Sequence, residues 1–435
     1  MTITVIGAGY VGLVTAVVFS ELGNRVFCID VNKERVSLLQ GGKAPFYEPR
    51  LEELLQTNIS KKKLVFTDSY EASVPKSQIV LVCVGTPPKD NGEADLSYLF
   101  SAVEETAKHL KAYTLIAIKS TIPVGFEDDL ENRAKKFAKS KFEFASCPEF
   151  LREGSAIEDS FHPDRIVIGA SSEKAQKTLL ELHAPLSGER IICDSRSAQL
   201  IKYAANAMLA VKISFANAIA DICERTGADV EKVLSGVGAD KRIGRQFLYP
   251  GVGYGGSCLP KDVQAFIATA RQFDYNFDFL RAVQEINEGQ VKKFVNKIRT
   301  ALSAREQEGK DLSGKKIAVL GLSFKPNTDD LRDAPSIKII TKLLEIGAQI
   351  QAYDPKAMKN AQRILPQKVK FCNDPYEAAK DVQAILLITE WDEFKEIDFE
   401  KLKKVVSSPI LIDGRNIFDK VKLKKLGFTY IGVGR

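Results

Sequence analysis

The feature that most constrains the fold is a glycine pattern near the amino terminus. Gly7, Gly9 and Gly12 are spaced as Gly-x-Gly-x-x-Gly. The apolar run at residues 3–6 predicts a strand before them, and the apolar periodicity of residues 12–21 predicts a helix after them. In such a unit the first glycine permits a tight turn, the second admits a pyrophosphate, and the third allows close helix–strand packing. The chain therefore begins with a predicted dinucleotide-binding βαβ unit.

A carboxylate at the end of the second predicted strand bears on the type of dinucleotide. The apolar run at residues 25–29 is followed directly by Asp30. A carboxylate in this place accepts hydrogen bonds from ribose hydroxyls and repels a 2′-phosphate, so it favours NAD over NADP. Lys33 and Arg35 follow closely, and because their positive charges suit a 2′-phosphate, NADP remains an alternative cofactor. A glycine-rich turn without a ligand is the other alternative, but the strand, the helix and Asp30 favour the dinucleotide.

Two further apolar runs, residues 79–84 and 115–119, end in loops that contain threonine and proline. Loops after the carboxyl ends of parallel strands line the ligand crevice of a doubly wound sheet. Thr86 and Thr121 are therefore candidate neighbours of the cofactor. The alternative is an ordinary proline-containing loop, and for Thr121 the sequence does not choose between the two.

The length and the order of the patterns predict more than one domain. The chain has 435 residues, which is more than one hydrophobic core usually holds. Strand-like runs alternate with helical patterns in the first third, which predicts a parallel sheet covered on both faces. Residues 199–224 predict one long helix, and residues 263–273 and 278–297 predict two more.

The alternation of strands and helices resumes in the last third. Charged, helix-prone residues 305–314 lead into strand-like runs at residues 316–321, 349–353, 384–388, 410–413 and 430–433. The predicted fold class is α/β, with two doubly wound Rossmann-like domains joined by a central all-helical domain with a long helix. The expected domain boundaries are 1–196, 197–300 and 301–435.

Residues 199–224 carry apolar side chains around much of the predicted long helix. A helix of this length and pattern suits a buried interface better than an exposed surface. We therefore expect a homodimer, or a larger homo-oligomer, that forms through this helix.

Composition argues against several kinds of partner. Lys and Arg number 62 and Asp and Glu 56, and the net charge of +6 is too small to indicate nucleic-acid binding. The seven cysteines include no Cys-x-x-Cys pair, which indicates reduced thiols in the cytoplasm. The three histidines lack metal-ligand spacing, so we expect no metal site. The first residues do not resemble a signal peptide, and apolar residues 11–19 are too few to span a membrane.

A second glycine-rich segment, residues 253–262, places Cys258 after Gly255 and Gly256 and before Lys261 and Asp262. A thiolate adds to an aldehyde to give a thiohemiacetal, which loses a hydride to give a thioester that water cleaves. In this interpretation Lys261 stabilises the thiolate and Asp262 orients the water. The alternative is a buried structural cysteine, but the open glycine backbone around Cys258 favours the nucleophile.

Four segments together resemble one family of enzymes. They are residues 147–154, 202–206, 240–244 and 253–262. With them the chain resembles, nearly end to end, the UDP-glucose/GDP-mannose dehydrogenase family, whose members remove four electrons from a nucleotide sugar. The resemblance implies NAD as cofactor and UDP-glucose as substrate, oxidised at C6 to UDP-glucuronate. GDP-mannose and UDP-N-acetyl-hexosamines are the alternative substrates, and GDP-mannose dehydrogenases also carry a leucine where this chain has Leu259.

The resemblance also implies a catalytic set. Glu149 matches an acid/base glutamate that acts with a water, and Lys202 matches a lysine that stabilises negative charge on the substrate oxygen. Asn206 follows Lys202 by one helical turn and matches an asparagine that positions substrate and water. The expected catalytic residues are Thr121, Glu149, Lys202, Asn206, Cys258 and Asp262.

The ligand-binding residues that the resemblance implies fall into two groups. The expected cofactor contacts are Gly7, Gly9, Tyr10, Val11, Gly12, Asp30, Lys33, Thr86, Thr121, Glu153, Lys261 and Arg332. The expected substrate contacts are Glu149, Phe150, Leu151, Arg152, Glu153, Lys202, Asn206, Arg242, Phe247, Leu248, Tyr249, Gly255, Cys258, Phe324, Lys325 and Arg415. Arg242 is expected to act in a partner subunit. For each cation the alternative is an ordinary surface charge.

Proteins of two other classes are alternatives. One is an NAD-binding protein without catalysis, against which Cys258, Lys202, Glu149 and Asp262 argue. The other is a nucleic-acid-binding protein, for which the mild basicity is the only support.

Overall fold

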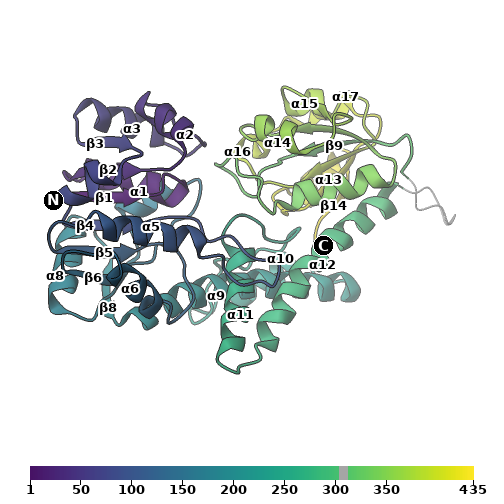
Figure 1. Ribbon diagram of the computed structural model, residues 1–435. Coiled ribbons are helices and arrows are strands. Elements are labelled where there is room, and N and C mark those ends of the chain that lie inside the picture. The colour runs from purple at the N-terminus through teal and green to yellow at the C-terminus, as the bar shows by residue number, and fades with distance from the viewer. Residues whose placement is uncertain (303–311) are drawn as a thin grey trace. The chain divides into compact units, whose positions relative to one another are not determined.

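The computed structural model of the chain describes residues 1–302 and 312–435 (Figure 1). Most of the helix-prone stretch 305–314 therefore lies outside the described residues. The described chain forms two compact units. The first contains Met1–Ala205 and Gln264–Asn276, and the second contains Asn206–Val263 and Phe277–Arg435.

The first unit is built on an eight-stranded sheet with the strand order β3-β2-β1-β4-β5-β6-β7-β8. Its strands are β1 Thr2–Ile6, β2 Arg25–Ile29, β3 Leu64–Thr67, β4 Ile79–Val82, β5 Thr114–Ile118, β6 Phe142–Ser146, β7 Arg165–Gly169 and β8 Glu189–Cys193. The strand β1 pairs in parallel with both β2 and β4. The chain order reverses between β1 and β4, and ligands of doubly wound sheets bind at such a switch point.

One strand pair differs from the parallel sheet that the sequence predicts. β6 and β7 are antiparallel, with Ser146 opposite Gly169. A parallel partner needs a crossover that returns to the start of the preceding strand. The connection 147–164 contains only the short helix α7, Ala156–Phe161, and its Gly154 contacts Tyr10, which follows the carboxyl end of β1. The connection therefore stays at the carboxyl edge of the sheet, and β7 runs back from there.

Helices cover both faces of this sheet (Figure 1). They are α1 Tyr10–Glu21, α2 Lys33–Gln40, α3 Leu51–Ser60, α4 Tyr70–Ser73, the 3-10 turn Val74–Lys76, α5 Ser97–Lys108, α6 Glu127–Lys135, α7 and α8 Glu173–Leu182. Leu13 of α1 shares one hydrophobic core with Leu81 of β4, whereas Leu99 of α5 shares another with Val80. Successive residues of β4 thus point into different cores, and this explains why the strand is apolar throughout.

The second unit contains a six-stranded parallel sheet with the order β11-β10-β9-β12-β13-β14. Its strands are β9 Lys316–Leu320, β10 Gln349–Tyr353, β11 Lys370–Phe371, β12 Ala384–Leu387, β13 Ile410–Asp413 and β14 Thr429–Ile431. Its helices are α13 Pro335–Glu345, α14 Met358–Ile364, α15 Pro375–Ala378, α16 Asp392–Lys395, α17 Phe399–Val405 and α18 Lys420–Lys425. The predicted fold class, with two Rossmann-like sheets, is confirmed.

Four helices lie between the two sheets in the chain. They are α9 Ser195–Thr226, α10 Val230–Gly238, α11 Leu259–Gln272 and α12 Asp278–Leu302. The three predicted helices are present, but α11 begins at Leu259 rather than at residue 263. Pro260 is suited to the first turn of a helix, because the backbone N–H that proline lacks would have no hydrogen-bond partner within the helix there. Cys258 therefore directly precedes a helix, and Asp262 lies in its first turn.

Among the described residues, α9 alone is long and apolar enough to cross a membrane by length and composition. A core helix passes the same test. Buried polar side chains of α9 contact protein groups: the Ser214 hydroxyl donates to the Val283 carbonyl at 2.9 Å, and the Asn217 side-chain oxygen accepts the Gly251 N–H at 2.8 Å. These are the contacts of a helix that packs inside a protein.

The central position of β4 predicts a large cost for truncating its side chains. Leu81 is fully buried, so Leu81→Ala should lower the free energy of unfolding by about 2–5 kcal/mol through lost burial and the cavity left behind. The matched control Leu38→Ala, at a side chain that is 38% exposed, should lose less than about 1 kcal/mol. Urea denaturation followed by circular dichroism measures both, and equal losses would contradict the central position.

Candidate active site

The dinucleotide loop has the geometry that its glycine spacing predicts. Gly7 has a φ of +94°, and a Cβ there would lie 2.8 Å from the carbonyl oxygen of Cys83. A Cβ on Gly12 would lie 1.8 Å from the carbonyl oxygen of Gly7. At Gly9, by contrast, a Cβ would meet no atom within 4 Å. This open approach at the second glycine, beside Tyr10 and Val11 at the start of α1, fits a pyrophosphate.

Asp30 supports this loop from the end of β2. Its carboxylate accepts the Ala8 N–H at 2.8 Å and the Asn32 N–H at 2.9 Å, and the Arg35 guanidinium donates to it at 3.0 Å. Asp30 is 7% exposed, whereas Lys33 is exposed on α2. Arg35 thus pairs with the carboxylate beside which a ribose would bind, and a carboxylate in this position disfavours a 2′-phosphate.

The loops after β4 and β5 brace each other. The Thr86 hydroxyl donates to the Thr121 carbonyl at 3.0 Å, and the Ser120 hydroxyl donates to the Val84 carbonyl at 2.7 Å. Thr86 is buried and Thr121 is half-buried. The structure therefore brings these two predicted residues together at the carboxyl edge of the first sheet.

Glu149 and Lys202 form a buried ion pair in the first unit. The Lys202 ammonium donates to Glu149 Oε1 at 3.0 Å, and the Leu151 N–H donates to Oε2 at 2.6 Å. The two side chains are 7% and 4% exposed. Burial alone raises the pKa of Glu149, but the Lys202 charge and the hydrogen bonds outweigh it, so this pKa lies below its ordinary value. Glu149 is thus held as a carboxylate.

A second lysine near Glu149 was not predicted as a site residue. The Lys119 ammonium donates to the Cys147 carbonyl at 3.5 Å, and its charge also favours the ionised form of Glu149. Lys119 stands at the end of a predicted strand, and only the alignment of β5 beside β6 places it near the loop after Ser146. The sequence contains no local signal for this contact.

The rest of the 150–153 segment is ordered by neighbouring side chains. The Arg165 guanidinium lies 3.9 Å from the centre of the Phe150 ring, and Lys202 lies 5.3 Å from it. Arg152 donates to both carboxylate oxygens of Asp159, at 3.0 and 2.5 Å. Glu153 is 9% exposed. The expected substrate loop is therefore fixed in shape by contacts within the first unit.

In the second unit the structure brings Asn206, Lys261 and Asp262 together. The Asn206 side-chain amide donates to one oxygen of Asp262 at 2.6 Å, and the Lys261 ammonium donates to the other at 2.5 Å. Asp262 is 2% exposed. Both oxygens of the carboxylate are thus oriented, and Asn206 lies one turn after Lys202 on the same helix, α9.

Cys258 lies at the amino-terminal end of α11 and is half-buried, whereas Cys28, Cys83, Cys147, Cys223 and Cys372 are buried. Its sulfur is 3.6 Å from the Ser257 hydroxyl. A Cβ on Gly255 would lie 2.3 Å from the Asp333 carbonyl oxygen, and one on Gly256 would lie 2.5 Å from the Phe324 ring. The two glycines are therefore needed for the close approach of the 324–333 loop to the cysteine loop.

The predicted ligand-binding cations of the second unit, with Arg332 expected at the cofactor and Arg242, Lys325 and Arg415 at the substrate, differ in their surroundings. Arg415 donates to the carbonyl oxygens of Ile388 at 2.7 Å and Phe324 at 3.3 Å. Arg332 pairs with Asp330 through both carboxylate oxygens. Arg242 is 89% exposed and pairs with Asp240, and Lys325 lies 5.5 Å from the Phe324 ring centre.

Residues 247–249, Phe-Leu-Tyr, are also predicted substrate contacts. Phe247 has a φ of +65°, Leu248 is buried, and Tyr249 is 53% exposed beneath the Arg245 guanidinium. A residue other than glycine with positive φ is uncommon, and such residues gather at ligand sites. The Phe247 conformation is therefore consistent with a functional segment.

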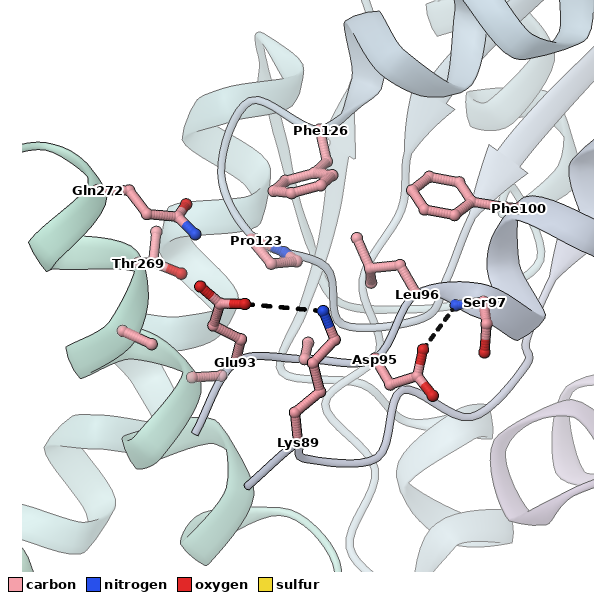
Figure 2. Close-up of a pocket in the computed structure, with 13 residues that line it drawn as sticks. Lys89, Glu93, Asp95, Leu96, Ser97, Phe100, Pro123, Phe126, Thr269 and Gln272 are labelled. Carbon is pink, nitrogen blue, oxygen red and sulfur yellow. Dashed lines mark hydrogen bonds and ion pairs between the residues drawn. The ribbon is translucent and has the colours of Figure 1, made fainter. Parts of the chain in front are cut away.

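A cavity of about 200 Å³ in the first unit lies apart from the predicted residues (Figure 2). It is lined by Leu96, Phe100, Pro123, Phe126 and one face of α11, and by the Lys89–Glu93 ion pair (Figure 2). Polar side chains also line it, but none of the predicted site residues does. Among the residues that the structure describes, no group of His, Cys, Asp and Glu could hold a metal ion.

The fold and the glycine loop together define a class of protein. A Gly-x-Gly-x-x-Gly turn at the switch point of a doubly wound sheet, with Asp30 at the end of β2, is the site of a dinucleotide-dependent oxidoreductase. The first unit also contains the buried Glu149–Lys202 ion pair, and the second unit contains the half-buried Cys258.

Comparisons with known proteins identify the family. The UDP-glucose/GDP-mannose dehydrogenase family matches with its NAD binding domain at residues 1–187, its central domain at 196–289 and its UDP binding domain at 318–420. The chain is 44% identical to the UDP-glucose 6-dehydrogenase TuaD of Bacillus subtilis, over 100% of this chain and 93% of that protein.

Solved structures of nucleotide-sugar dehydrogenases also match this chain over its full length. A UDP-glucose dehydrogenase from Pyrobaculum islandicum superposes with a TM-score of 0.91 at 37% identity, covering 100% of this chain and 97% of that one. A UDP-D-ManNAc dehydrogenase from Pyrococcus horikoshii has a TM-score of 0.86 at 28% identity, covering 100% and 99%. The chain therefore belongs to the UDP-glucose/GDP-mannose dehydrogenase family, and it is an NAD-dependent dehydrogenase.

The buried ion pair predicts a pH-dependent cost of removing its cation. Lys202→Met leaves the Glu149 carboxylate buried without its partner, which should cost about 3–5 kcal/mol of stability at pH 7. The pKa of Glu149 then rises above its ordinary 4.5, because burial is no longer opposed by Lys202. A native state with a raised pKa takes up a proton as the pH falls, so the difference from the wild-type protein should narrow toward pH 5.

Urea unfolding of the wild-type protein and the Lys202→Met variant at pH 7 and pH 5 measures this change. The control Lys177→Met replaces an exposed lysine of α8 and should cost little at either pH. A cost for Lys202→Met that is independent of pH would contradict the charge pairing with Glu149.

Proposed function

We propose that the protein oxidises UDP-glucose at C6 to UDP-glucuronate, with two NAD and one water consumed for each sugar. The half-buried Cys258 at the start of α11, with Asp262 oriented one turn later, is the observation that carries the proposal. A dehydrogenase that stops at an aldehyde needs no nucleophile, whereas one that continues to a carboxylate gains from a covalent thioester. The relative from Bacillus subtilis, named a UDP-glucose 6-dehydrogenase, supports this substrate.

The first oxidation needs a base and a stabilised oxygen. NAD bound at the Gly7–Gly12 loop would supply the acceptor for the hydride that leaves C6. Lys202 stabilises the negative charge that develops on the C6 oxygen, and its distance of 3.0 Å from Glu149 provides a short proton path. Glu149, held as a carboxylate, takes up the hydroxyl proton through a water. Thr121 is assigned to the same step, since its loop is braced beside Thr86.

The second oxidation passes through sulfur. The Cys258 thiolate adds to C6 of the aldehyde, and the resulting thiohemiacetal loses a hydride and becomes a thioester. The amino-terminal end of α11 stabilises an anion at this position through its free amides and dipole. Asp262 and Asn206 then hold the water that cleaves the C–S bond, which releases the carboxylate and restores the thiol.

The nucleotide part of the substrate is assigned to the second Rossmann-like sheet and to the 150–153 segment. Lys325 and Arg415 supply positive charge for the diphosphate or the sugar. Phe247, Leu248 and Tyr249 are assigned to the uracil and phosphate region. The match of the UDP binding domain at residues 318–420 supports this division of labour.

We assign the NAD-binding, central helical and UDP-sugar-binding domains to residues 1–196, 197–300 and 301–435. A homodimer through α9 is part of the proposal, because Leu200, Met208, Phe215 and Ile222 are 44–57% exposed and recur every seven or eight residues along this helix. The exposed Arg242 would act in the site of the second copy. The half-buried Cys258, which must stay reduced to react, suits the cytoplasm.

A UDP-N-acetyl-hexosamine or GDP-mannose is the second candidate substrate. Leu259 beside the cysteine and the structural similarity to a UDP-D-ManNAc dehydrogenase favour it.

The cysteine assignment predicts a selective loss of turnover. Cys258→Ser should lower kcat with UDP-glucose by about 10³-fold or more, because an alkoxide forms far less readily than a thiolate. NADH affinity, measured by fluorescence titration, should stay within about twofold, since the glycine loop is unchanged. Cys193→Ser, at another cysteine that is not fully buried, should keep full turnover. Undiminished turnover in Cys258→Ser would overturn the role of the sulfur.

The substrate assignment predicts both a preference and a stoichiometry. Against a panel of UDP-glucose, UDP-N-acetylglucosamine, UDP-N-acetylmannosamine and GDP-mannose, kcat/KM for UDP-glucose should be highest by about 100-fold or more. Absorbance at the end of the reaction should show two NADH formed for each sugar consumed. A higher kcat/KM for another nucleotide sugar would overturn the assignment of UDP-glucose as the substrate. Formation of one NADH for each sugar would contradict the covalent second oxidation.

A further inference from the structure

A buried carboxylate at the carboxyl edge of the first sheet belongs to none of the predicted residues. Glu48 lies in the connection between α2 and α3 and is 4% exposed. It accepts hydrogen bonds from the Tyr10 hydroxyl, from the Gly154 N–H at 2.6 Å and from the Ala156 N–H at 2.8 Å. Burial raises its pKa and these donors oppose that effect.

The donors come from two segments with different proposed ligands. Tyr10 is the first residue of α1 and lies inside the glycine pattern of the dinucleotide loop. Gly154 and Ala156 lie one and three positions after the 150–153 segment that is assigned to the nucleotide sugar. The Gly154 N–H also lies 3.1 Å from the Tyr10 oxygen, so Tyr10, Glu48 and Gly154 form one closed cluster.

A purely local role accounts for only part of this cluster. A carboxylate at the start of α7 stabilises the helix through the Ala156 N–H and the helix dipole. It does not require the Tyr10 hydroxyl, which is contributed from a segment 144 positions earlier than Gly154. Burial and the nearby Glu48 charge raise the pKa of Tyr10, so its hydroxyl keeps the proton that it donates.

Gly154 adds a backbone constraint. It has a φ of +82°, a conformation that other residues rarely adopt. The turn that carries the substrate segment into α7 is therefore held in one shape by its backbone and by the hydrogen bond to Glu48. A shift of Tyr10 would be transmitted to this turn through the shared carboxylate.

We propose that Glu48 is a positioning residue that couples the dinucleotide loop to the 149–156 segment, so that cofactor and nucleotide sugar bind cooperatively. The proposal rests on the proposed function, because the second segment is assigned to the sugar there. A ligand that orders Tyr10 also orders Glu48 and the Gly154 turn, and the second ligand then loses less conformational entropy. By linkage, each ligand must raise the affinity of the other by the same factor.

The first experiment uses the cofactor alone and is independent of the sugar. Hydrogen–deuterium exchange is followed in peptides that cover residues 150–157, with and without saturating NADH. In the wild-type protein NADH should slow exchange there by about fivefold or more. In Tyr10→Phe, which removes one oxygen and keeps the ring, and in Glu48→Gln, the slowing should fall below about twofold. Equal slowing in all three proteins would overturn the coupling.

The second experiment measures the coupling itself. NADH and UDP-glucose are both reduced and cannot react, so NADH affinity can be titrated by fluorescence with and without UDP-glucose. UDP-glucose should tighten NADH binding by about fivefold or more in the wild-type protein. This tightening factor should fall toward one in Tyr10→Phe and in Glu48→Gln. The double variant should show no smaller tightening factor than either single variant, because both changes remove the same contact. An unchanged factor in these variants, or none in the wild-type protein, would contradict the proposal.

Glu52→Gln is the matched control. Glu52 accepts the Ala44 N–H at 3.1 Å in the same part of the chain but lies outside the cluster, so this variant should keep the wild-type coupling factor. A protein that shows the exchange effect but does not oxidise UDP-glucose would refute the proposed function and leave the link between the two loops standing. A protein that oxidises UDP-glucose with no exchange effect would refute the link alone.

Discussion

Each buried carboxylate near the carboxyl ends of the parallel strands needs hydrogen-bond donors. The shapes of the loops within each unit depend on this constraint. An ionised carboxylate taken from water without partners costs several kcal/mol, so each one fixes the groups around it. Asp30 holds the Ala8 amide of the dinucleotide loop, and Glu149 holds Lys202 and the Leu151 amide. Glu48 holds the start of α7. Loops that have no regular structure of their own thereby acquire a defined shape.

The second unit follows the same rule with a different outcome. Asp354 follows β10 as Asp30 follows β2, and it accepts the Leu322 N–H at 2.7 Å and the Trp391 indole N–H at 3.1 Å. Protein donors therefore engage this carboxylate, as they also engage Asp30. Asp413, at the end of β13, accepts the Arg415 N–H at 2.9 Å and so positions a predicted substrate cation. A repeated architecture thus carries two different kinds of site.

The local patterns of the sequence were sufficient for most of the fold. The strands β2, β10 and β13 begin and end where the sequence predicts them, at residues 25–29, 349–353 and 410–413. The early start of α11 and the antiparallel β7 were not predicted. Pro260 suits the first turn of α11 but does not by itself mark where the helix begins, and the direction of β7 depends on where the preceding loop ends.

The amino-acid sequence by itself determined the chemistry that this protein carries: a glycine turn that admits a pyrophosphate, a carboxylate after β2, and a cysteine among glycines. These signals are short-range, because each arises from residue types within about ten positions of one another. Only the tertiary structure decided which distant residues support them. Glu48 accepts a hydrogen bond from Gly154, which lies 106 positions away, and Lys119 donates to Cys147, which lies 28 positions away. Strand order brings these loops together regardless of their separation in the chain.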